Sequence, residues 1–173
     1  LSLFNGVANR RLAAALSYFH VAVRLSVAGN SPWEFMAESI LNYAKCLEIL
    51  FVTSGTSMDD TRRELKKLSY DEEEIEGDFV PILLLRSRID VAHPRVAIFK
   101  SKDLKVLYRY MAECEERFRT MLTRVLSAVI DGHYQLVKNP ELSLSAEEQR
   151  DVDSLVKQME SRLGVVATPL GGN

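Results

Sequence analysis

The chain of 173 residues has few cysteines and no long apolar run. Its two cysteines, Cys46 and Cys114, do not form a Cys-x-x-Cys pair, and each lies in an apolar helical pattern. Buried, reduced thiols in an intracellular protein are the expected result. No apolar stretch approaches the roughly 18 residues of a membrane span, and no signal peptide is recognisable. We therefore expect a cytoplasmic protein that does not associate with membranes.

The sequence also lacks a large excess of charge of one sign and the short motifs of several enzyme classes. With a formal net charge of −2, it has no overall attraction for nucleic acid, so RNA binding would depend on a local basic patch. There is no repeat, glycine-rich phosphate loop, zinc-ligand spacing or nucleophile elbow. The acidic run at 71–76 would fan its carboxylates around a helix axis, which favours solvated surface or a helix N-terminus. We expect neither a metal nor a cofactor.

Apolar residues recur at helical spacing along most of the chain, and no stretch alternates as a strand. Three Ser-x-x-acid patterns, at Ser31, Ser57 and Ser145, indicate helix starts. The predicted helices cover residues 10–27, 31–50, 57–70, 79–92, 101–136 and 145–163. Together they predict an all-α fold, an up-and-down helical bundle of five to six helices in one domain, 1–163, with a flexible tail, 164–173. Because the chain opens on Leu1 and not on methionine, we expect a fragment or a processed form of a longer protein.

Three of these helices carry a regular apolar stripe that predicts the core. The acidic and basic residues of the helix 101–136 lie on its other faces, and Gly132 is expected to fray its end. We expect His133 and Tyr134 to form a surface pair. The predicted core residues are Leu12, Leu16, Phe19, Val23 and Ser26 or Val27 in the first helix; Trp33, Met36, Ile40, Tyr43, Leu47 and Leu50 in the second; and Leu107, Met111, Cys114, Phe118, Met121 and Val125 in the long helix.

The stretch from Phe79 to Val96 combines a buried element with polar chemistry. The apolar run 79–85 leads directly into Arg86, and His93 follows seven residues later, just before Pro94. In a helix, seven residues return to within roughly 20° of the same face. Pro94 disfavours the α conformation at the residue before it, which would leave the imidazole at an exposed helix end. In an alternative interpretation without chemistry, Arg86 pairs with Asp90 along the helix and His93 caps its C-terminus.

These residues carry a resemblance to a known family. Arg86-x6-His93, with the polar Ser87 after the arginine, resembles the R-x4-6-H motif of the HEPN superfamily of helical-bundle ribonucleases. The helix segment 42–51 (NYAKCLEILF) is similar to the aromatic-and-LE helix of the Apea-like HEPN branch. The likeness covers roughly residues 31–130. The sequence departs from the family pattern in its spacing, which is at the upper limit, and in Pro94, which stands where that branch often has glycine. Arg88-x4-His93 would fit the shorter form of the motif.

The resemblance implies a metal-independent endoribonuclease that acts as a homodimer, such as a toxin or a defence effector, with an antitoxin or a flanking domain as a further partner. His93 would be the general acid and base, and Arg86 would bind the phosphate of RNA. The alternative is a catalytically inactive HEPN-like module for dimerisation or partner binding in a larger protein. A third alternative is an unrelated helical adaptor, in which Arg86 would be buried against Glu48 and His93 would lie far from any dimer axis.

Several neighbours of this motif have two interpretations each. Glu48 lies in an apolar part of its helix and either reaches solvent or pairs with Arg86. Ser87 bonds either to phosphate or to its own helix backbone, and Asp90 either orients His93 or neutralises Arg86. A local basic segment accompanies the motif, which suits either RNA binding or a solvated surface. The cations proposed to contact RNA are Arg88, Arg95, Lys100 and Lys102, with Lys105 in the same segment.

Overall fold

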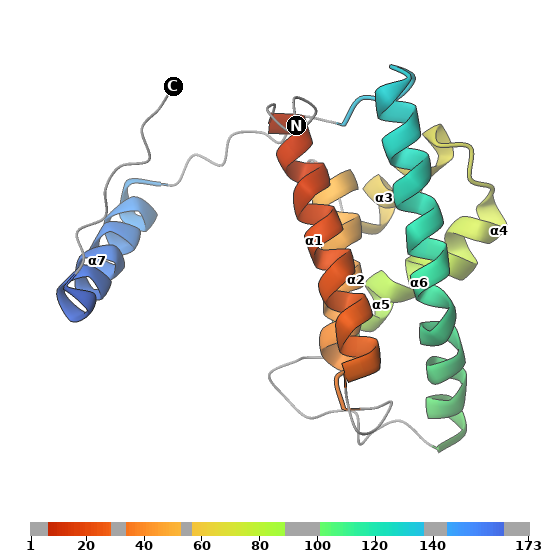
Figure 1. The fold of residues 1–173 in the computed structure, drawn as a ribbon, viewed down its shortest axis with the longest axis horizontal. Coiled ribbons are helices and arrows are strands. Elements are labelled where there is room, and N and C mark those ends of the chain that lie inside the picture. Colours follow the sequence, from red (N-terminus) through yellow and green to blue (C-terminus); the bar gives the residue numbers. More distant parts are fainter. Residues whose placement is uncertain (1–6, 29–33, 53–56, 89–100, 137–144, 165–173) are drawn as a thin grey trace. The chain divides into compact units, whose positions relative to one another are not determined.

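The computed structural model describes residues 7–28, 34–52, 57–88, 101–136 and 145–164, without the side chains of 7–9, 88, 101–104 and 163. Every regular element in these ranges is a helix, and the expected all-α helical bundle is confirmed for them. The chain divides into two compact units, Leu1–Lys138 and Asn139–Asn173, and a single domain over 1–163 stays a prediction. The first unit holds α1 (Val7–Ala28), α2 (Met36–Phe51), α3 (Ser57–Lys67), α4 (Glu72–Glu74), α5 (Val80–Arg88) and α6 (Ser101–Ile130), and the second holds α7 (Ala146–Leu163) (Figure 1).

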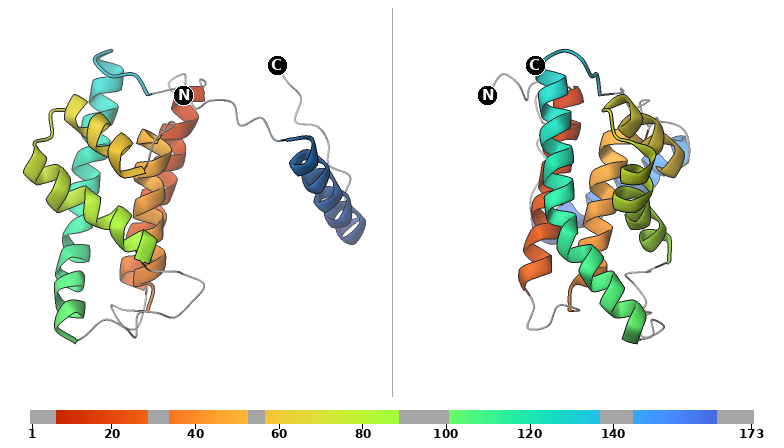
Figure 2. Two further views of the ribbon diagram at one scale, coloured as in Figure 1. Left: turned by 180° about the vertical axis from the view of Figure 1, so that it is seen from behind. Right: turned by 90° about the vertical axis from the view of Figure 1, so that its right-hand side faces the viewer.

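The centre of the first unit is α2. It contacts α1 on one side and α3 and α5 on another, as both views in Figure 2 show. Nine of its 16 residues are buried. This number is larger than a single apolar stripe would give, because two faces of the helix are covered. The predicted stripe of α2 is confirmed from Met36 to Leu50, and Trp33 lies outside the described residues.

A row of five aromatic rings connects the helices of this unit. Its members lie in α1, α2, α6 and the segment that precedes α5. Centroid distances of 4.6 to 6.3 Å suit tilted and edge-to-face pairs. The rings follow in the order Phe19, Tyr43, Phe118, Phe79 and Tyr70. The predicted stripe of α6 is confirmed, since all six of its residues are buried. Cys46 and Cys114 are buried free thiols, as expected.

The predicted stripe of α1 is wrong in two places. Leu16 is 37% exposed, and of the pair Ser26 or Val27 both are exposed, Val27 by 75%. Ala15 and Ala22, in contrast, are fully buried. Small residues let α1 approach α2 closely, and the Ser39 hydroxyl of α2 donates a hydrogen bond to the Ala22 carbonyl at 2.9 Å. The buried side of α1 therefore includes two alanines, which a pattern of large apolar residues does not reveal.

The starts and ends of α2 and α3 also differ from the predictions. Helix α2 begins at Met36 with no side-chain cap, and Glu34 lies in the turn before it; Ser31 and Pro32 lie outside the described residues. The helix begins where burial begins, because tertiary packing contributes more to helix stability than a capping pattern does. Helix α3 ends at Lys67 and not near Tyr70, since Ser69 has a left-handed backbone with φ of 62°.

The segment that contains α5 begins earlier than the predicted Phe79. The acidic run forms a helix N-terminus, one of its two expected roles. The Asp71 carboxylate accepts a hydrogen bond from the Glu74 N–H at 2.8 Å, and the Glu74 carboxylate accepts one from the Asp71 N–H at 3.0 Å. A π-helical turn, Ile75–Phe79, then joins α4 to α5. This turn directly precedes Pro81, which has no N–H to donate to the carbonyl four residues before it.

The C-terminal end of α6 corrects two further predictions. The helix ends at Ile130 and not at residue 136, because Gly132 has φ of 72°. The N–H of His133 bonds to the Ala128 carbonyl and the N–H of Gly132 to the Val129 carbonyl, which is the Schellman pattern of a helix end. His133 is exposed as expected, but Tyr134 is buried and donates a hydrogen bond to Glu64 at 3.0 Å.

Helix α7 agrees closely with its prediction. The Ser145 hydroxyl accepts from the Glu148 N–H, and the Glu148 carboxylate accepts from the Ser145 N–H. This capping box starts the helix. Its end is marked by Gly164, whose left-handed backbone has φ of 63°.

Candidate functional site

Arg86 lies near the end of α5, and its side chain is 43% exposed. Its Nη1 donates a hydrogen bond to Oε1 of Glu48, which reaches it from α2. The Glu48 side chain is 20% exposed, so the pair lies at the edge of the contact between α2 and α5. Of the two interpretations of Glu48, the structure has the ion pair.

The electrostatics of this pair follow from its partial burial. Burial raises the pKa of the Glu48 carboxyl, and the charges of Arg86 and Lys45 oppose this effect without cancelling it, so that the pKa stays above its ordinary value. Removing Arg86 would therefore leave a partly buried carboxylate with less compensation. The pair fixes the position of the guanidinium relative to α2.

The Ser87 hydroxyl donates to the Leu84 carbonyl of its own helix at 2.7 Å. Of its two interpretations, this is the bond to the helix backbone. The hydroxyl oxygen keeps its acceptor capacity but has used its one proton.

The other predicted site residues are not placed by the structure. Asp90, His93, Arg95 and Lys100 lie outside the described residues, and so does Pro94. Arg88 belongs to α5 and Lys102 to the first turn of α6, but their side chains are not described. The structure thus brings together Glu48 and Arg86 and leaves the facing of Arg86 and His93 as a prediction.

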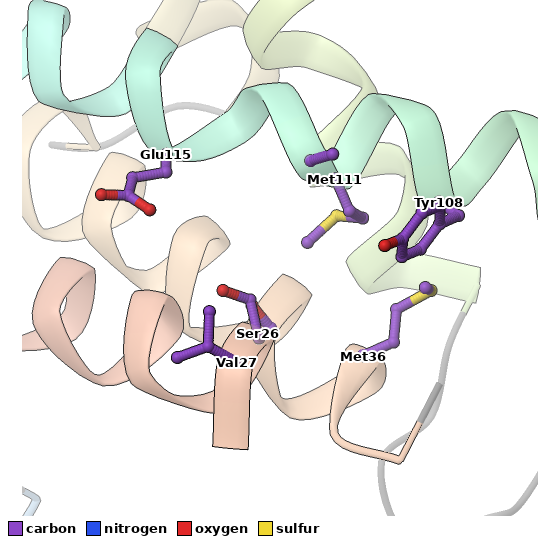
Figure 3. A pocket seen from close by; sticks show the side chains of 8 residues that line it. Ser26, Val27, Met36, Tyr108, Met111 and Glu115 are labelled. Carbon is purple, nitrogen blue, oxygen red and sulfur yellow. The ribbon is translucent and has the colours of Figure 1, made fainter. Parts of the chain in front are cut away.

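A pocket that the sequence did not reveal lies between α1, α2 and α6 (Figure 3). It encloses about 210 Å³. Its two serine hydroxyls are already engaged: Ser26 donates to the Val23 carbonyl at 2.7 Å and Ser39 to the Ala22 carbonyl. Glu115 is paired with Arg119. The pocket therefore suits an apolar group better than a reaction that needs a nucleophile and a base. Its lining residues are Ser26, Val27, Met36, Ser39, Tyr108, Met111, Ala112 and Glu115.

Within the described ranges no three His, Cys, Asp or Glu side chains converge in a way that could hold a metal ion. None of the described helices combines the length and the apolar character needed to cross a membrane.

The fold defines the class of the protein as a packed all-α bundle. Comparison with known proteins adds no family to this description. No family model, no curated protein and no solved structure matches the chain.

Proposed function

We propose that the chain is a metal-independent endoribonuclease of the HEPN type, which acts as a homodimer. In this proposal Arg86 binds the scissile phosphate and His93 serves as general acid and base. The proposal rests on the sequence resemblance of Arg86-x6-His93 and of segment 42–51, within an all-α bundle. The finer assignment to the Apea-like HEPN branch belongs to the same proposal.

The observation that supports it best is the position of the Arg86 guanidinium. It lies at an exposed end of α5 and is held from α2 by Glu48 through Nη1. The N–H groups on Nη2 and Nε of the same guanidinium are not used in this bond and can still donate to a phosphate. An unrelated adaptor would have Arg86 buried against Glu48 and His93 far from any dimer axis. Arg86 is paired with Glu48, but its side chain is 43% exposed, and His93 lies outside the described residues.

The proposed reaction needs one base and one acid. A neutral imidazole takes the proton of a ribose 2′-hydroxyl, whose oxygen attacks the adjacent phosphorus while the bond to the 5′-oxygen breaks. A protonated imidazole gives its proton to that leaving oxygen, and the products are a 2′,3′-cyclic phosphate and a 5′-hydroxyl. Since the motif supplies one histidine per chain, the second imidazole comes from His93 of a second copy. Arg86 stabilises the charge that develops on the phosphate oxygens.

In the same proposal the RNA backbone follows the basic segment after α5. Arg88, Arg95, Lys100 and Lys102 would contact its phosphates, and the exposed Lys105 of α6 extends this segment. An antitoxin or a flanking domain would control access to the site. Salt should weaken RNA binding, because phosphate contacts release counterions.

The test is cleavage of a mixed-sequence RNA in excess EDTA, with analysis of the product ends and light scattering on each sample. We expect the wild-type chain to leave cyclic-phosphate ends, and His93→Ala and Arg86→Ala each to lower the rate by about 100-fold or more. His20→Ala and Arg24→Ala are matched controls, because both residues are exposed on α1. Equal loss in the controls, or cleavage that survives in both site variants, would overturn the proposal.

A second candidate is a catalytically inactive module for dimerisation or partner binding. It is favoured by the fact that Arg86 is partly neutralised by Glu48 and that Ser87 donates to its own helix. A folded dimer that cleaves no RNA would select this candidate.

A further inference from the structure

Helix α7 has a row of apolar side chains that no described residue of its own unit covers. Val152, Leu155 and Met159 are between 41% and 57% exposed, and Val156 is partly exposed. These residues recur at steps of three and four, so they lie on one face of the helix. The unit Asn139–Asn173 contains no other described helix. We call this row the α7 stripe.

The ends of α7 are set by its own residues, but no described helix of its unit packs against the α7 stripe. Ser145 and Glu148 form the capping box at the start of the helix, and Gly164 follows its end. Caps set the bounds of a helix, whereas most of its stability in proteins comes from packing of its apolar face. We therefore expect a partner for α7.

The charge of α7 disfavours a membrane surface as this partner. The helix contains five carboxylates and three cations, a formal charge of −2. Amphipathic helices that lie on membranes are rich in lysine and arginine on the polar face, because anionic lipids attract these cations. An acidic helix is repelled by the same lipids, so a protein surface suits the α7 stripe better.

The two halves of α7 differ in charge. Residues 146–154 contain four carboxylates and one arginine, a formal charge of −3, and residues 155–163 contain two cations and one carboxylate, a formal charge of +1. Two parallel copies would place the −3 halves beside each other, whereas two antiparallel copies place each −3 half beside a +1 half. Antiparallel helices also bring opposite ends of their dipoles together. We propose that the α7 stripe binds the α7 stripe of a second copy of the chain, in antiparallel orientation.

The size of α7 sets the expected strength of this pairing. A helix of 18 residues is about 27 Å long. One such helix from each copy should bury less than the about 1,200 Å² of a stable interface, so we expect a Kd of about 10 to 100 μM. The proposal does not depend on RNA cleavage, because Arg86 and His93 belong to the other unit.

The test is the distance between two spin labels, one on each copy of the full chain with Ala146→Cys. Ala146 is exposed at the first position of α7, and Cys46 and Cys114 are buried, so the label attaches to the new cysteine. Antiparallel helices hold the two labels at opposite ends of the pair, roughly 25 Å apart, and parallel helices hold them roughly 10 Å apart. We expect the longer distance in electron paramagnetic resonance at about 200 μM chain.

Two variants and a matched control test the α7 stripe. Val152→Asp and Leu155→Asp each place a charge in the stripe and should weaken pairing about tenfold or more, measured from the fraction of labels at the longer distance. Val106→Asp makes the same change at an exposed valine of α6 and should leave pairing within about twofold. All three side chains are exposed, so the variants should fold.

Three results would overturn the proposal. One is the absence of a defined label distance at up to about 500 μM chain, which would mean that a different surface covers the stripe. Another is the shorter distance, which would mean parallel helices, and the third is equal weakening by Val106→Asp. A ribonuclease dimer formed by the other unit does not by itself give the longer distance, and loss of RNA cleavage leaves that distance unchanged. The two proposals can therefore fail separately.

Discussion

Glu64 is a charged residue inside the first unit, with a side chain only 1% exposed. Three donors surround its carboxylate: Lys67 at 2.8 Å, Tyr134 at 3.0 Å and Arg63 at 3.1 Å. Burial by itself raises the pKa of Glu64, but hydrogen bonds from Lys67, Tyr134 and Arg63 outweigh it, and the pKa is lowered. The carboxylate is therefore ionised in the folded protein, and it ties the end of α6 to α3.

Replacement of Glu64 by glutamine tests this bonding at the residue scale. The amide cannot accept equally well from three donors, so we expect Glu64→Gln to lower the free energy of unfolding by about 1 to 3 kcal/mol at pH 7. Because the folded pKa is below the unfolded one, the contribution is present above the unfolded pKa, about 4.3. It is lost as the pH falls through the folded pKa. Urea unfolding of the wild type and of Glu64→Gln, at pH 7 and at a pH below the folded pKa of Glu64, measures how much of the difference in stability is lost in acid.

Glu73→Gln serves as the control in these measurements, since Glu73 is exposed. It should change the free energy of unfolding by less than about 0.5 kcal/mol. A loss from Glu64→Gln that persists undiminished in acid would mean that packing, and not ionisation, is responsible.

At the scale of elements, α3 and α6 end in the same way with different residues. In each, a residue with positive φ follows the helix, and the next N–H reaches back to a carbonyl five residues earlier. The residue is Gly132 after α6 and Ser69 after α3. A left-handed backbone costs an L-residue about 1 kcal/mol that glycine does not lose. Helix α3 therefore ends under a small strain that α6 avoids.

This comparison predicts opposite effects of two substitutions. Ser69→Gly should raise the free energy of unfolding, and Gly132→Ala should lower it, each by about 0.5 to 1 kcal/mol. A Cβ at residue 132 would meet no atom within 4 Å, so the backbone alone causes the loss. Thermal and urea unfolding of the two variants show whether the free energy of unfolding rises or falls in each. Effects of the same sign in both variants would contradict the account.

At the scale of the whole molecule, periodicity predicted the two helices that carry large apolar stripes. The stripes of α2 and α6 could be predicted without knowing which helices pack against them. The ends of α7 could be predicted from local residues, Ser145 and Gly164. Local patterns failed where tertiary contact decides, as for the two buried alanines of α1. They also failed at Tyr134, which is buried because Glu64, seventy residues away, accepts its hydrogen bond.

The candidate sites divide in the same way. Glu48 was a candidate partner of Arg86 because a carboxylate in an apolar helix needs a cation, and the structure has this pair. A groove between the segment 70–79 and α6 gave no such signal. It is formed where residues 70–79 lie against residues 113–124. No sequence pattern within either segment predicts that the two segments are in contact.

The reactivity of the two buried cysteines can report when the core opens. Cys46 of α2 and Cys114 of α6 are both buried, and burial raises the pKa of the Cys114 thiol to about 12 and that of Cys46 further. Alkylating reagents attack the thiolate, so each sulfur should react only when its helix separates from the core. Mass spectrometry of partly labelled chains then gives the labelling rate of each cysteine, and so the rate at which its helix leaves the core. Equal labelling rates mean that α2 and α6 open in one cooperative event, whereas faster labelling of Cys114 means that α6 leaves before α1 and α2 part.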